Sequence, residues 1–367
     1  MRPVILNLTI LLAAGFLANS ATPKTSDAPQ VENARLERKA LAGSLAAEVK
    51  SWTSQATQPQ WLGYSVPQIG KDRTMCCGDY DGSWPNHCGR CRLEDGQSGN
   101  NMTSRDEGTT TKLEAPRAMF VLFRAENKRI TKIRVVSQDC ELDAGGLRFT
   151  WLEGVKPPES VELLESFVHG KDQDVDEDEH VWHGALTAIA LHADPAADRA
   201  LESFTQPSEP ESLRRQTAFW LGAAREKSGL ALLQKMAKRD PSSEVRSHVA
   251  FALSISGQPG AIEEMIRMAH EDESSHVRGQ ALFWLAHKAG QKAVGAITGA
   301  IENDPDTDVK KKAVFALSQL PRDEGVPKLI EVAQTNRNRE VRKQAMFWLG
   351  QSHDPRALAF FEKILTQ

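Results

Sequence analysis

The chain has 367 residues, with 45 basic and 49 acidic side chains and a formal net charge of -4. This small net charge provides no overall field that would hold the protein on nucleic acid or on an anionic membrane. Hydrophobic residues make up 40% of the chain, including 8 Trp and 13 Phe, which excludes a disordered chain. A chain of this length is expected to form two domains, or one domain joined to a repeat array.

Residues 1–20 are predicted to be a signal peptide. Arg2 supplies a short positive start, and residues 4–18 are almost entirely apolar. This stretch is shorter than the roughly 20 residues that a membrane-spanning helix needs. The small residues Ala18 and Ser20 mark a cleavage point after Ser20. We therefore expect a periplasmic or secreted protein with no membrane span after signal cleavage.

Residues 21–57 are predicted to be a polar segment followed by a linker helix. The stretch 31–52 is rich in Ala, Glu, Lys and Arg, which are residues that favour helices. Leu36, Ala40 and Leu41 give this predicted helix only a narrow apolar stripe. The pattern indicates a helix that links domains or docks weakly on one of them.

Residues 58–155 predict a small strand-rich domain. The segment 61–66 has the composition of a strand, and 118–124 and 130–137 predict a hairpin joined by a short polar turn. A further strand is expected at 147–152, after two glycines. A long loop rich in Gly, Asn, Asp, Ser and Thr separates the first two strands.

The cysteines offer the strongest chemical signal in this domain, and the helical repeats contain none. They are Cys76, Cys77, Cys88, Cys91 and Cys140. For an exported chain, disulfide bonds are the favoured interpretation. With His87 or Cys140 the loop also holds enough ligands for tetrahedral zinc, although the adjacent pair departs from the usual spacing of structural sites. A redox Cys-x-x-Cys motif is the third alternative.

Five is an odd number of cysteines. One thiol is therefore expected to be free, bound to a metal, or paired with another chain. Cys76 or Cys140 is the residue that we expect to be left over.

Residues 156–180 predict a capping helix and an acidic linker. The sequence at 164–167 recurs at 201–204, as expected for a degenerate repeat at the start of an array. The acidic run that follows begins like a calcium loop, but Glu177 and His183 stand where such a loop needs Gly and Glu. A solvated acidic hinge is the favoured interpretation.

Six units with a strict spacing of 32 residues occupy 181–367. Their first residues are Val181, Leu213, Val245, Val277, Val309 and Val341. Counting the first residue as offset 0, the apolar or small positions fall at offsets 0, 4, 5 and 8, which is the spacing of one helix face. A second apolar set follows near offsets 17 and 20. Each unit is therefore predicted to be two short antiparallel helices that are stable only when the units stack.

A charge pattern repeats with the same period. Acidic or amide residues stand at offset 27, and basic residues stand at offset 1 of the units. These positions are Asp240, Asp272, Asp304 and Asn336, and Arg214, Arg246, Arg278, Lys310 and Arg342. Asp or Asn at this place is expected to cap the next helix. The favoured interpretation is a structural ladder that fixes the stacking angle, and the alternative is a basic row that holds an acidic partner.

Aromatic residues follow the units as well. Phe fills offset 6 in five of the six units, and Trp follows it at Trp220, Trp284 and Trp348, whereas Ala252 and Ala316 stand between them. Offset 7 lies close to offset 0 around a helix, so these Trp side chains are expected to point into the core. The alternative is an exposed Trp stripe that stacks on sugars or binds a partner helix.

The repeat pattern resembles the HEAT repeat family, especially its short bacterial form, the phycobilisome-lyase-like HEAT-like repeats. The resemblance covers 181–367 and implies a mainly α fold, an α-α superhelical solenoid that binds proteins. It also implies a bacterial source. Deoxyhypusine hydroxylase, an enzyme of the wider family, has paired His-Glu motifs, but here His270-Glu271 stands alone. Bilin lyases, another enzyme group of the wider family, attach a tetrapyrrole to a partner protein. These repeats show neither a nucleophile nor a pocket for that chemistry.

The sequence as a whole predicts an exported protein–protein interaction scaffold that needs no cofactor. The expected partner is another protein, whose identity the sequence does not reveal, and no catalytic residue can be assigned. The alternative is a metal- or thiol-dependent enzyme or redox sensor centred on Cys76, Cys77, Cys88 and Cys91, with the repeats as its docking arm. The oligomeric state is left open.

Overall fold

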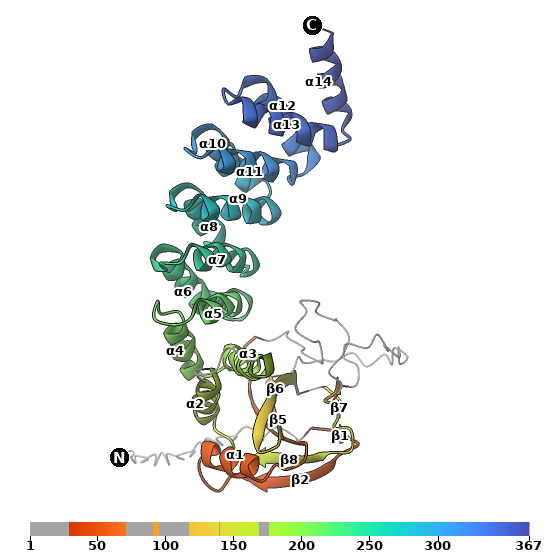
Figure 1. The fold of residues 1–367 in the computed structure, drawn as a ribbon, viewed down its shortest axis with the longest axis vertical. Helices are drawn as coiled ribbons and strands as arrows, with labels where there is room; N and C mark the ends of the chain where they lie inside the picture. Colours follow the sequence, from red (N-terminus) through yellow and green to blue (C-terminus); the bar gives the residue numbers. More distant parts are fainter. Residues whose placement is uncertain (1–28, 71–90, 95–116, 139, 169–175, 367) are drawn as a thin grey trace, which may run out of the picture.

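The computed structural model describes residues 29–70, 91–94, 117–138, 140–168 and 176–366. The predicted signal peptide and part of the acidic linker lie outside this range. A twisted sheet with helices on one face forms one end of the molecule, and a curved stack of helix pairs extends from it (Figure 1). None of the helices in the described ranges is both long enough and apolar enough to cross a membrane.

The main sheet has five strands in the order β2-β8-β3-β5-β6. These strands are β2 (Arg35–Ala40), β3 (Gln60–Pro67), β5 (Ala118–Glu126), β6 (Arg129–Ser137) and β8 (Arg148–Glu153). Strand β8 pairs in parallel with both β2 and β3, while β3, β5 and β6 are antiparallel. The predicted strands and hairpin are confirmed, and the turn residues Asn127 and Lys128 both have positive φ, as a tight hairpin turn requires.

Side chains alternate between the two faces of this sheet, and each face buries a separate apolar cluster. Trp61 and Phe120 pack on one face with a small three-stranded sheet of β1 (Val31–Glu32), β7 (Leu142–Asp143) and β4 (Cys91–Arg92). Leu62 and Val121 pack on the other face against helices, in a cluster that continues through the whole solenoid. The sheet and the solenoid therefore share one hydrophobic core.

The predicted helix at 31–52 is wrong for residues 31–44 and is confirmed only from Leu45 onward. This stretch forms β1 and β2 before helix α1 begins at Leu45, and α1 (Leu45–Ser54) is capped by the Ser44 side chain. Every residue of β2 is exposed, yet the strand pairs along its whole length with β8, from Arg35 opposite Arg148 to Ala40 opposite Glu153. Backbone pairing with a strand more than a hundred residues away overrides the local helix propensity.

The rest of the chain is helical. Helix α2 (Pro157–Val168) precedes twelve helices in six pairs, one pair for each sequence unit. The pairs are α3 (Asp176–Leu191) and α4 (Pro195–Phe204), α5 (Glu211–Ala224) and α6 (Glu226–Arg239), α7 (Ser243–Ile255) and α8 (Ala261–Glu271), α9 (Ser275–Ala289) and α10 (Gln291–Asn303), α11 (Thr307–Ser318) and α12 (Arg322–Thr335), and α13 (Arg339–Gln351) and α14 (Pro355–Leu365). The predicted solenoid is confirmed.

The apolar positions of the repeat fill the space between neighbouring pairs. In the fourth unit Val277, Ala281, Leu282 and Leu285 have no exposed surface. The Phe residues at offset 6 do not join this buried set. They are half-buried in four units, and Phe347 in the last unit is 55% exposed.

Helix α3 joins the solenoid to the sheet by lying directly on strand β6. A side chain at Gly184 would collide with the backbone carbonyl of Ile133, so the contact requires a residue without a Cβ. The end of β3 also bonds the end of α3, where the Ile69 amide donates to Leu191 O and the Ala193 amide donates to Pro67 O. The first helix pair therefore packs against the sheet on one side and against the second helix pair on the other.

A buried polar chain crosses this junction. The Tyr64 hydroxyl lies 2.8 Å from Ser160 Oγ, which lies 2.9 Å from His192 Nε2. The second ring nitrogen of His192 has no hydrogen-bond partner, and Arg225 donates to the His192 carbonyl oxygen at 2.6 Å. Ser160 has no exposed surface, so its hydroxyl is out of reach of a substrate even though the Ser–His spacing suits catalysis.

Burial lowers the pKa of His192 to about 4, with nearby Asp194 opposing the shift and Arg225 adding to it. The unfolded state takes up a proton near pH 6.5, at the ordinary pKa of histidine, whereas the folded state does so only near pH 4. The free energy of unfolding therefore falls as the pH drops from 6.5 toward 4. The full loss for this group is about 3 kcal/mol.

We predict that His192→Gln flattens the pH dependence of stability across this window. The measurement is the urea midpoint of the full chain at several pH values between 4 and 7.5. His270→Gln, which changes an exposed histidine of α8, is the matched control and should keep the wild-type slope. Equal slopes for wild type and His192→Gln would contradict the assignment.

Candidate partner-binding surface

The described cysteines lie beside the small sheet. Cys91 begins β4 and Cys140 precedes β7; both side chains are buried against the main sheet. Both are disulfide-bonded, so Cys140 is not the unpaired thiol that was expected. Cys76, Cys77 and Cys88 lie outside the described residues, as does His87. Within the described ranges no group of three or more His, Cys, Asp or Glu side chains could hold a metal ion.

The charge ladder is built from three buried ion pairs with two hydrogen bonds each. Arg214 binds Asp240, Arg246 binds Asp272, and Arg278 binds Asp304. In each pair Nε donates to one carboxylate oxygen at 2.7–2.8 Å, and Nη2 donates to the other at 3.0–3.2 Å. This fork-to-carboxylate geometry is the strongest that an Arg–Asp pair adopts.

Each ladder arginine also reaches back to the unit before its own. Arg246 Nη1 donates to Asp240 O at 2.8 Å, and Arg278 Nη1 donates to Asp272 O at 2.9 Å. One guanidinium therefore connects the ends of two successive units and fixes how they stack. Because both side chains of each pair are buried, the ladder does not form a row that an acidic partner can reach.

The ladder ends before the last two units. In the fifth unit Lys310 donates to the carbonyl oxygen of Glu302 at 2.8 Å, and Asn336 replaces the aspartate. Arg342 still donates to Asn336 O at 2.8 Å. The joint between the fifth and sixth units therefore lacks the ion pair that fixes the earlier joints.

The expected capping role of the ladder aspartates is wrong. Asp240, Asp272 and Asp304 are C-cap residues of the second helix of each unit. Their carboxylates accept the backbone N–H two residues later, at 2.8–2.9 Å. The residue that donates this N–H is itself the N-cap of the next helix. Ser242 and Asp306 are examples, and their side chains accept the capping hydrogen bonds.

The Phe and Trp side chains form a continuous aromatic row, in which each ring contacts the next. In spatial order the row is Trp220, Phe219, Phe251, Trp284, Phe283, Phe315, Trp348 and Phe347. Phe rings of paired units stack, with centroids 6.2 Å apart at an angle of 16° and 6.0 Å apart at 12°. The Trp rings link these stacks at centroid distances of 4.8–5.1 Å.

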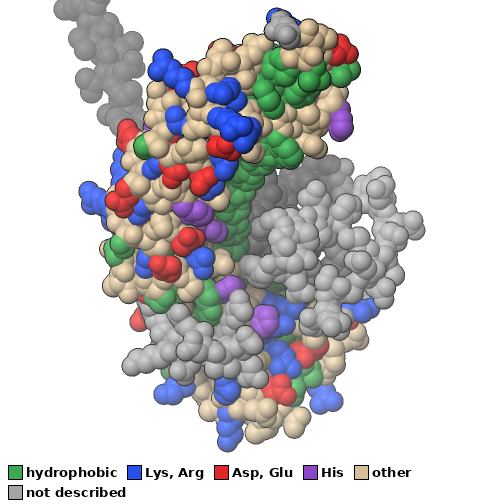
Figure 2. Space-filling model, turned by 45° about the horizontal axis from the view of Figure 1, so that its top comes forward, with side chains coloured by type: hydrophobic (Ala, Val, Ile, Leu, Met, Phe, Trp, Pro, Cys, Tyr) green, Lys and Arg blue, Asp and Glu red, His purple; other side chains and the backbone are tan. Residues whose placement is uncertain are grey.

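The rings of this row come from the odd-numbered helices α5 to α13, which lie on the side of the solenoid toward the sheet (Figure 1). Figure 2 shows hydrophobic side chains gathered into a strip along the solenoid. Trp220 is buried, whereas Trp284 and Trp348 are half-buried. The expectation that the Trp side chains are core residues therefore holds for the first of the three and only partly for the others.

The helix face that carries the row is free of acidic residues. Offsets 2, 3, 6, 9 and 10 of the last five units contain no Asp or Glu, and they contain four cations. The cations are Arg215, Lys311, Lys312 and Lys343. Asp308 and Glu340, at the first turn of their helices, pair with Lys311 and Lys343 at 2.9 and 3.1 Å. The row therefore has a basic and amide-rich border.

Two histidines lie against the rings. His248 contacts Phe251 at a centroid distance of 5.5 Å, and His287 contacts Phe283 at 4.3 Å. Burial lowers the pKa of His248, and the nearby Arg215 lowers it further. A neutral imidazole at this place adds to the aromatic surface.

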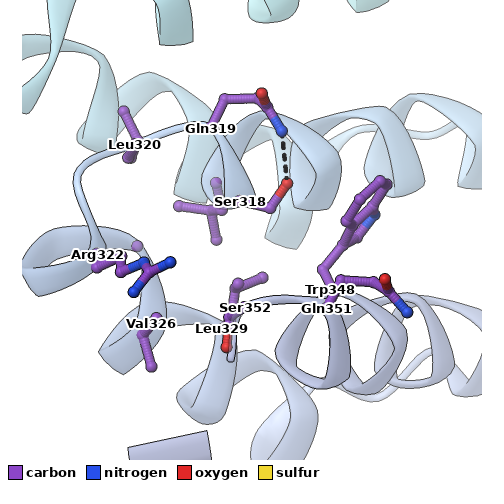
Figure 3. A pocket seen from close by; sticks show the side chains of 11 residues that line it. Ser318, Gln319, Leu320, Arg322, Val326, Leu329, Trp348, Gln351 and Ser352 are labelled. Atoms are coloured by element: carbon purple, nitrogen blue, oxygen red, sulfur yellow. Dashed lines mark hydrogen bonds between the residues drawn. The ribbon is translucent and has the colours of Figure 1, made fainter. Parts of the chain in front are cut away.

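A pocket of about 240 Å³ opens where the row ends. It lies between α11, α12 and α13, and the indole of Trp348 forms one of its walls (Figure 3). A second, smaller pocket of about 30 Å³ adjoins Phe219 and Trp220 at the other end of the row. The larger pocket has the volume of a single amino-acid side chain with its backbone, and the smaller one holds only a water molecule.

The row was not recognised from sequence as a surface, although its signal was present. Offset 6 lies between the buried offsets and the exposed ones around a helix. A Phe at every such position is therefore a half-exposed stripe and not a part of the core. The stacking of the rings depends on the spacing of units in space, which periodicity alone does not give.

We predict that Asp304→Ala destabilises the solenoid by about 3–5 kcal/mol, because it leaves the buried guanidinium of Arg278 without its carboxylate. Urea unfolding followed by far-UV circular dichroism measures the loss. Glu331→Ala, which breaks the exposed pair with Lys328, is the control and should change stability by less than about 1 kcal/mol. Similar losses for the two variants would show that the ladder is not a structural joint.

Comparisons with known proteins agree with this architecture. The family model described as HEAT repeats matches residues 199–286 and 295–367. No curated protein matches the chain.

Solved structures that are similar include human deoxyhypusine hydroxylase, at 17% identity over 56% of this chain and 90% of that one, with a TM-score of 0.29. The CpcE–CpcF complex of phycocyanin lyase from Nostoc sp. PCC7120 is similar at 19% identity over 54% and 77%, with a TM-score of 0.32. The Escherichia coli protein YibA is similar at 22% identity over 59% and 82%, with a TM-score of 0.36.

The matched residues begin within α4 and continue to the end of the chain, with a gap at 287–294. They include the helix pairs that repeat every 32 residues and the Arg–Asp pairs between them. The sheet and its cysteines lie outside the matched residues. The matched residues, 199–286 and 295–367, have the sequence pattern of HEAT repeats and lie in the helical half of the chain.

Proposed function

We propose that this protein is an exported scaffold that holds another protein on its aromatic row. The observation that carries the proposal is the row itself, in which eight contacting rings lie along the five odd-numbered helices α5 to α13. Six of these rings are half-buried and Phe347 is exposed. Solenoids present extended surfaces of this kind to their partners. Aromatic residues dominate the binding energy of protein interfaces because they bury large area at low entropic cost.

The ladder supports this proposal because its buried charges are used between the units and are not available to a partner. The buried arginines serve the joints between units, so the cations at the edge of the row are Arg215, Lys311, Lys312 and Lys343. An apolar row with a basic border favours a partner that is apolar in the middle and acidic at its edge. No cofactor is needed for binding of this kind.

The experiment compares three versions of the mature chain as bait in affinity capture from the envelope fraction and the culture medium. Phe251→Ser combined with Phe283→Ser interrupts the row, and we expect at least a tenfold loss of the captured partner, as for interface hot spots. Leu358→Ser, which removes an exposed apolar side chain of α14 outside the row, should leave capture unchanged. Capture that survives the double substitution would place the partner elsewhere.

Export is the second part of the proposal. The apolar stretch at 4–18 and the disulfide state of Cys91 and Cys140 support it, because disulfides persist in oxidising compartments. We propose that the cysteines staple a small sheet whose core is limited in size.

We predict that the secreted or periplasmic protein begins at Ala21 and has one reactive thiol after denaturation without reductant. N-terminal sequencing and thiol titration test this, and titration after reduction should detect all five cysteines. Five free thiols in the unreduced protein, or stoichiometric zinc in protein prepared without chelator, would favour the metal- or thiol-dependent alternative.

A further inference from the structure

The pocket at the end of the aromatic row is the place in the described structure where unsatisfied polar groups and apolar walls meet. Ser318 and Gln319 come from the end of α11, Arg322 and Val326 from the start of α12, and Trp348 from α13 (Figure 3). The apolar side chain of Leu329 lies beside Val326. The pocket has both an apolar side and a polar side.

The hydroxyls that line this pocket are already engaged. Ser318 Oγ donates to Phe315 O at 2.6 Å and accepts from the Gln319 amide at 3.0 Å. Ser352 Oγ donates to Leu349 O at 2.7 Å. These hydroxyls already have hydrogen-bond partners, so other side chains of the pocket must bind a ligand.

The groups that remain include several hydrogen-bond donors without acceptors. The exposed guanidinium of Arg322 makes no hydrogen bond or ion pair with any described residue, although its charge helps to lower the pKa of the nearby Asp354. The side-chain amide of Gln351 has no hydrogen-bond partner among the described residues either. The indole N–H of Trp348 has no acceptor either, but it is shielded from solvent, so the accessible donors are those of Arg322 and Gln351. The residues that line the pocket include no Asp or Glu. A site with spare donors and a positive charge takes an anionic acceptor.

The apolar wall restricts which anion fits. Val326 and Leu329 are buried next to the donors, so the ligand must carry an apolar group within one residue of its negative charge. The pocket volume of about 240 Å³ accommodates one residue and little more. A polypeptide combines an aliphatic side chain and a carboxylate in one residue only at its C-terminus. In Asp and Glu the carboxylate is the end of the side chain itself, so no aliphatic side chain is left to contact Val326 and Leu329.

The position of the pocket relates it to the row. The Trp348 ring that forms its wall also contacts Phe315 at a centroid distance of 4.9 Å. A chain that lies along the row therefore arrives at the pocket with its end. The joint here is the one between the fifth and sixth units, where the ladder has no Arg–Asp pair. Arg356 of α14 instead contacts Asp323 and the carbonyl oxygen of Arg322, both of α12, each at 3.1 Å.

We propose that this pocket binds the C-terminal carboxylate and last aliphatic side chain of the partner polypeptide, with Arg322 as the residue that holds the carboxylate. The inference rests on the proposed function in one respect, which is that the rest of the partner lies along the aromatic row. The pocket's own preference for a carboxylate beside an aliphatic group is independent of that.

The experiment titrates the full mature chain with N-acetyl-leucine and follows the indole N–H signal of Trp348 by two-dimensional NMR, with Trp348→Phe used to assign it. A probe of about 12 non-hydrogen atoms is expected to bind with a dissociation constant on the order of 1 mM. N-acetyl-leucinamide, which lacks the charge, should bind at least fivefold more weakly. N-acetyl-glutamate α-amide has its carboxylate on the side chain and should also bind at least fivefold more weakly.

Two variants identify the residue. Arg322→Gln should weaken binding of N-acetyl-leucine at least fivefold and leave binding of the amide unchanged, and Arg322→Lys should restore part of the preference for the acid. Arg337→Gln removes the same charge from an exposed position outside the pocket and should have no effect. Equal binding of acid and amide, or an unchanged affinity in Arg322→Gln, would overturn the proposal.

The outcome is separate from that of the capture experiment. Loss of capture in the row variants together with no carboxylate preference would leave the scaffold and remove the pocket. A carboxylate preference together with capture that survives the row variants would keep the pocket and remove the row as the partner's path.

Discussion

The buried Arg–Asp pair at each early joint is the interaction on which the form of this protein depends. A guanidinium that bonds both oxygens of one aspartate and the carbonyl of another unit leaves little freedom in the angle between helix pairs. Replacing such a pair by apolar residues is often harmless to stability, so its contribution here is to geometry. At two of these joints, Phe rings that are 32 residues apart in sequence stack about 6 Å apart in space.

The aromatic row forms because each odd-numbered helix has a buried apolar face and an exposed polar face, with a Phe at the boundary between them. The apolar positions at offsets 0, 4, 5 and 8 fill the seam between units, and offset 6 is left at its margin. Bulky rings at that margin cover each other instead of entering the core, which leaves a strip of apolar surface with a basic border. Contiguous apolar surface of this kind is typical of sites that contact another molecule.

The two ends of the solenoid differ in how they are closed. The first pair packs on the sheet through Gly184 and through the buried chain from Tyr64 to His192, so its apolar face is covered within the molecule. The last pair has no such cover, and Phe347, Leu358 and Leu365 are exposed there. The ladder stops, the pocket opens and the apolar surface increases within the same two units.

The sequence by itself determined the repeat, because the signal for a helix pair is local and recurs six times with one period. It also determined the strands of the hairpin, where alternation and a turn lie next to each other in the chain. Only the tertiary structure decided that 31–40 is a strand, that the Phe residues form a surface and that Tyr64, Ser160 and His192 meet. Each of these depends on contacts between distant residues, such as Arg35 with Arg148 and Tyr64 with Ser160. Local composition does not encode the distances between such elements, and stacking and burial set them when the units pack together.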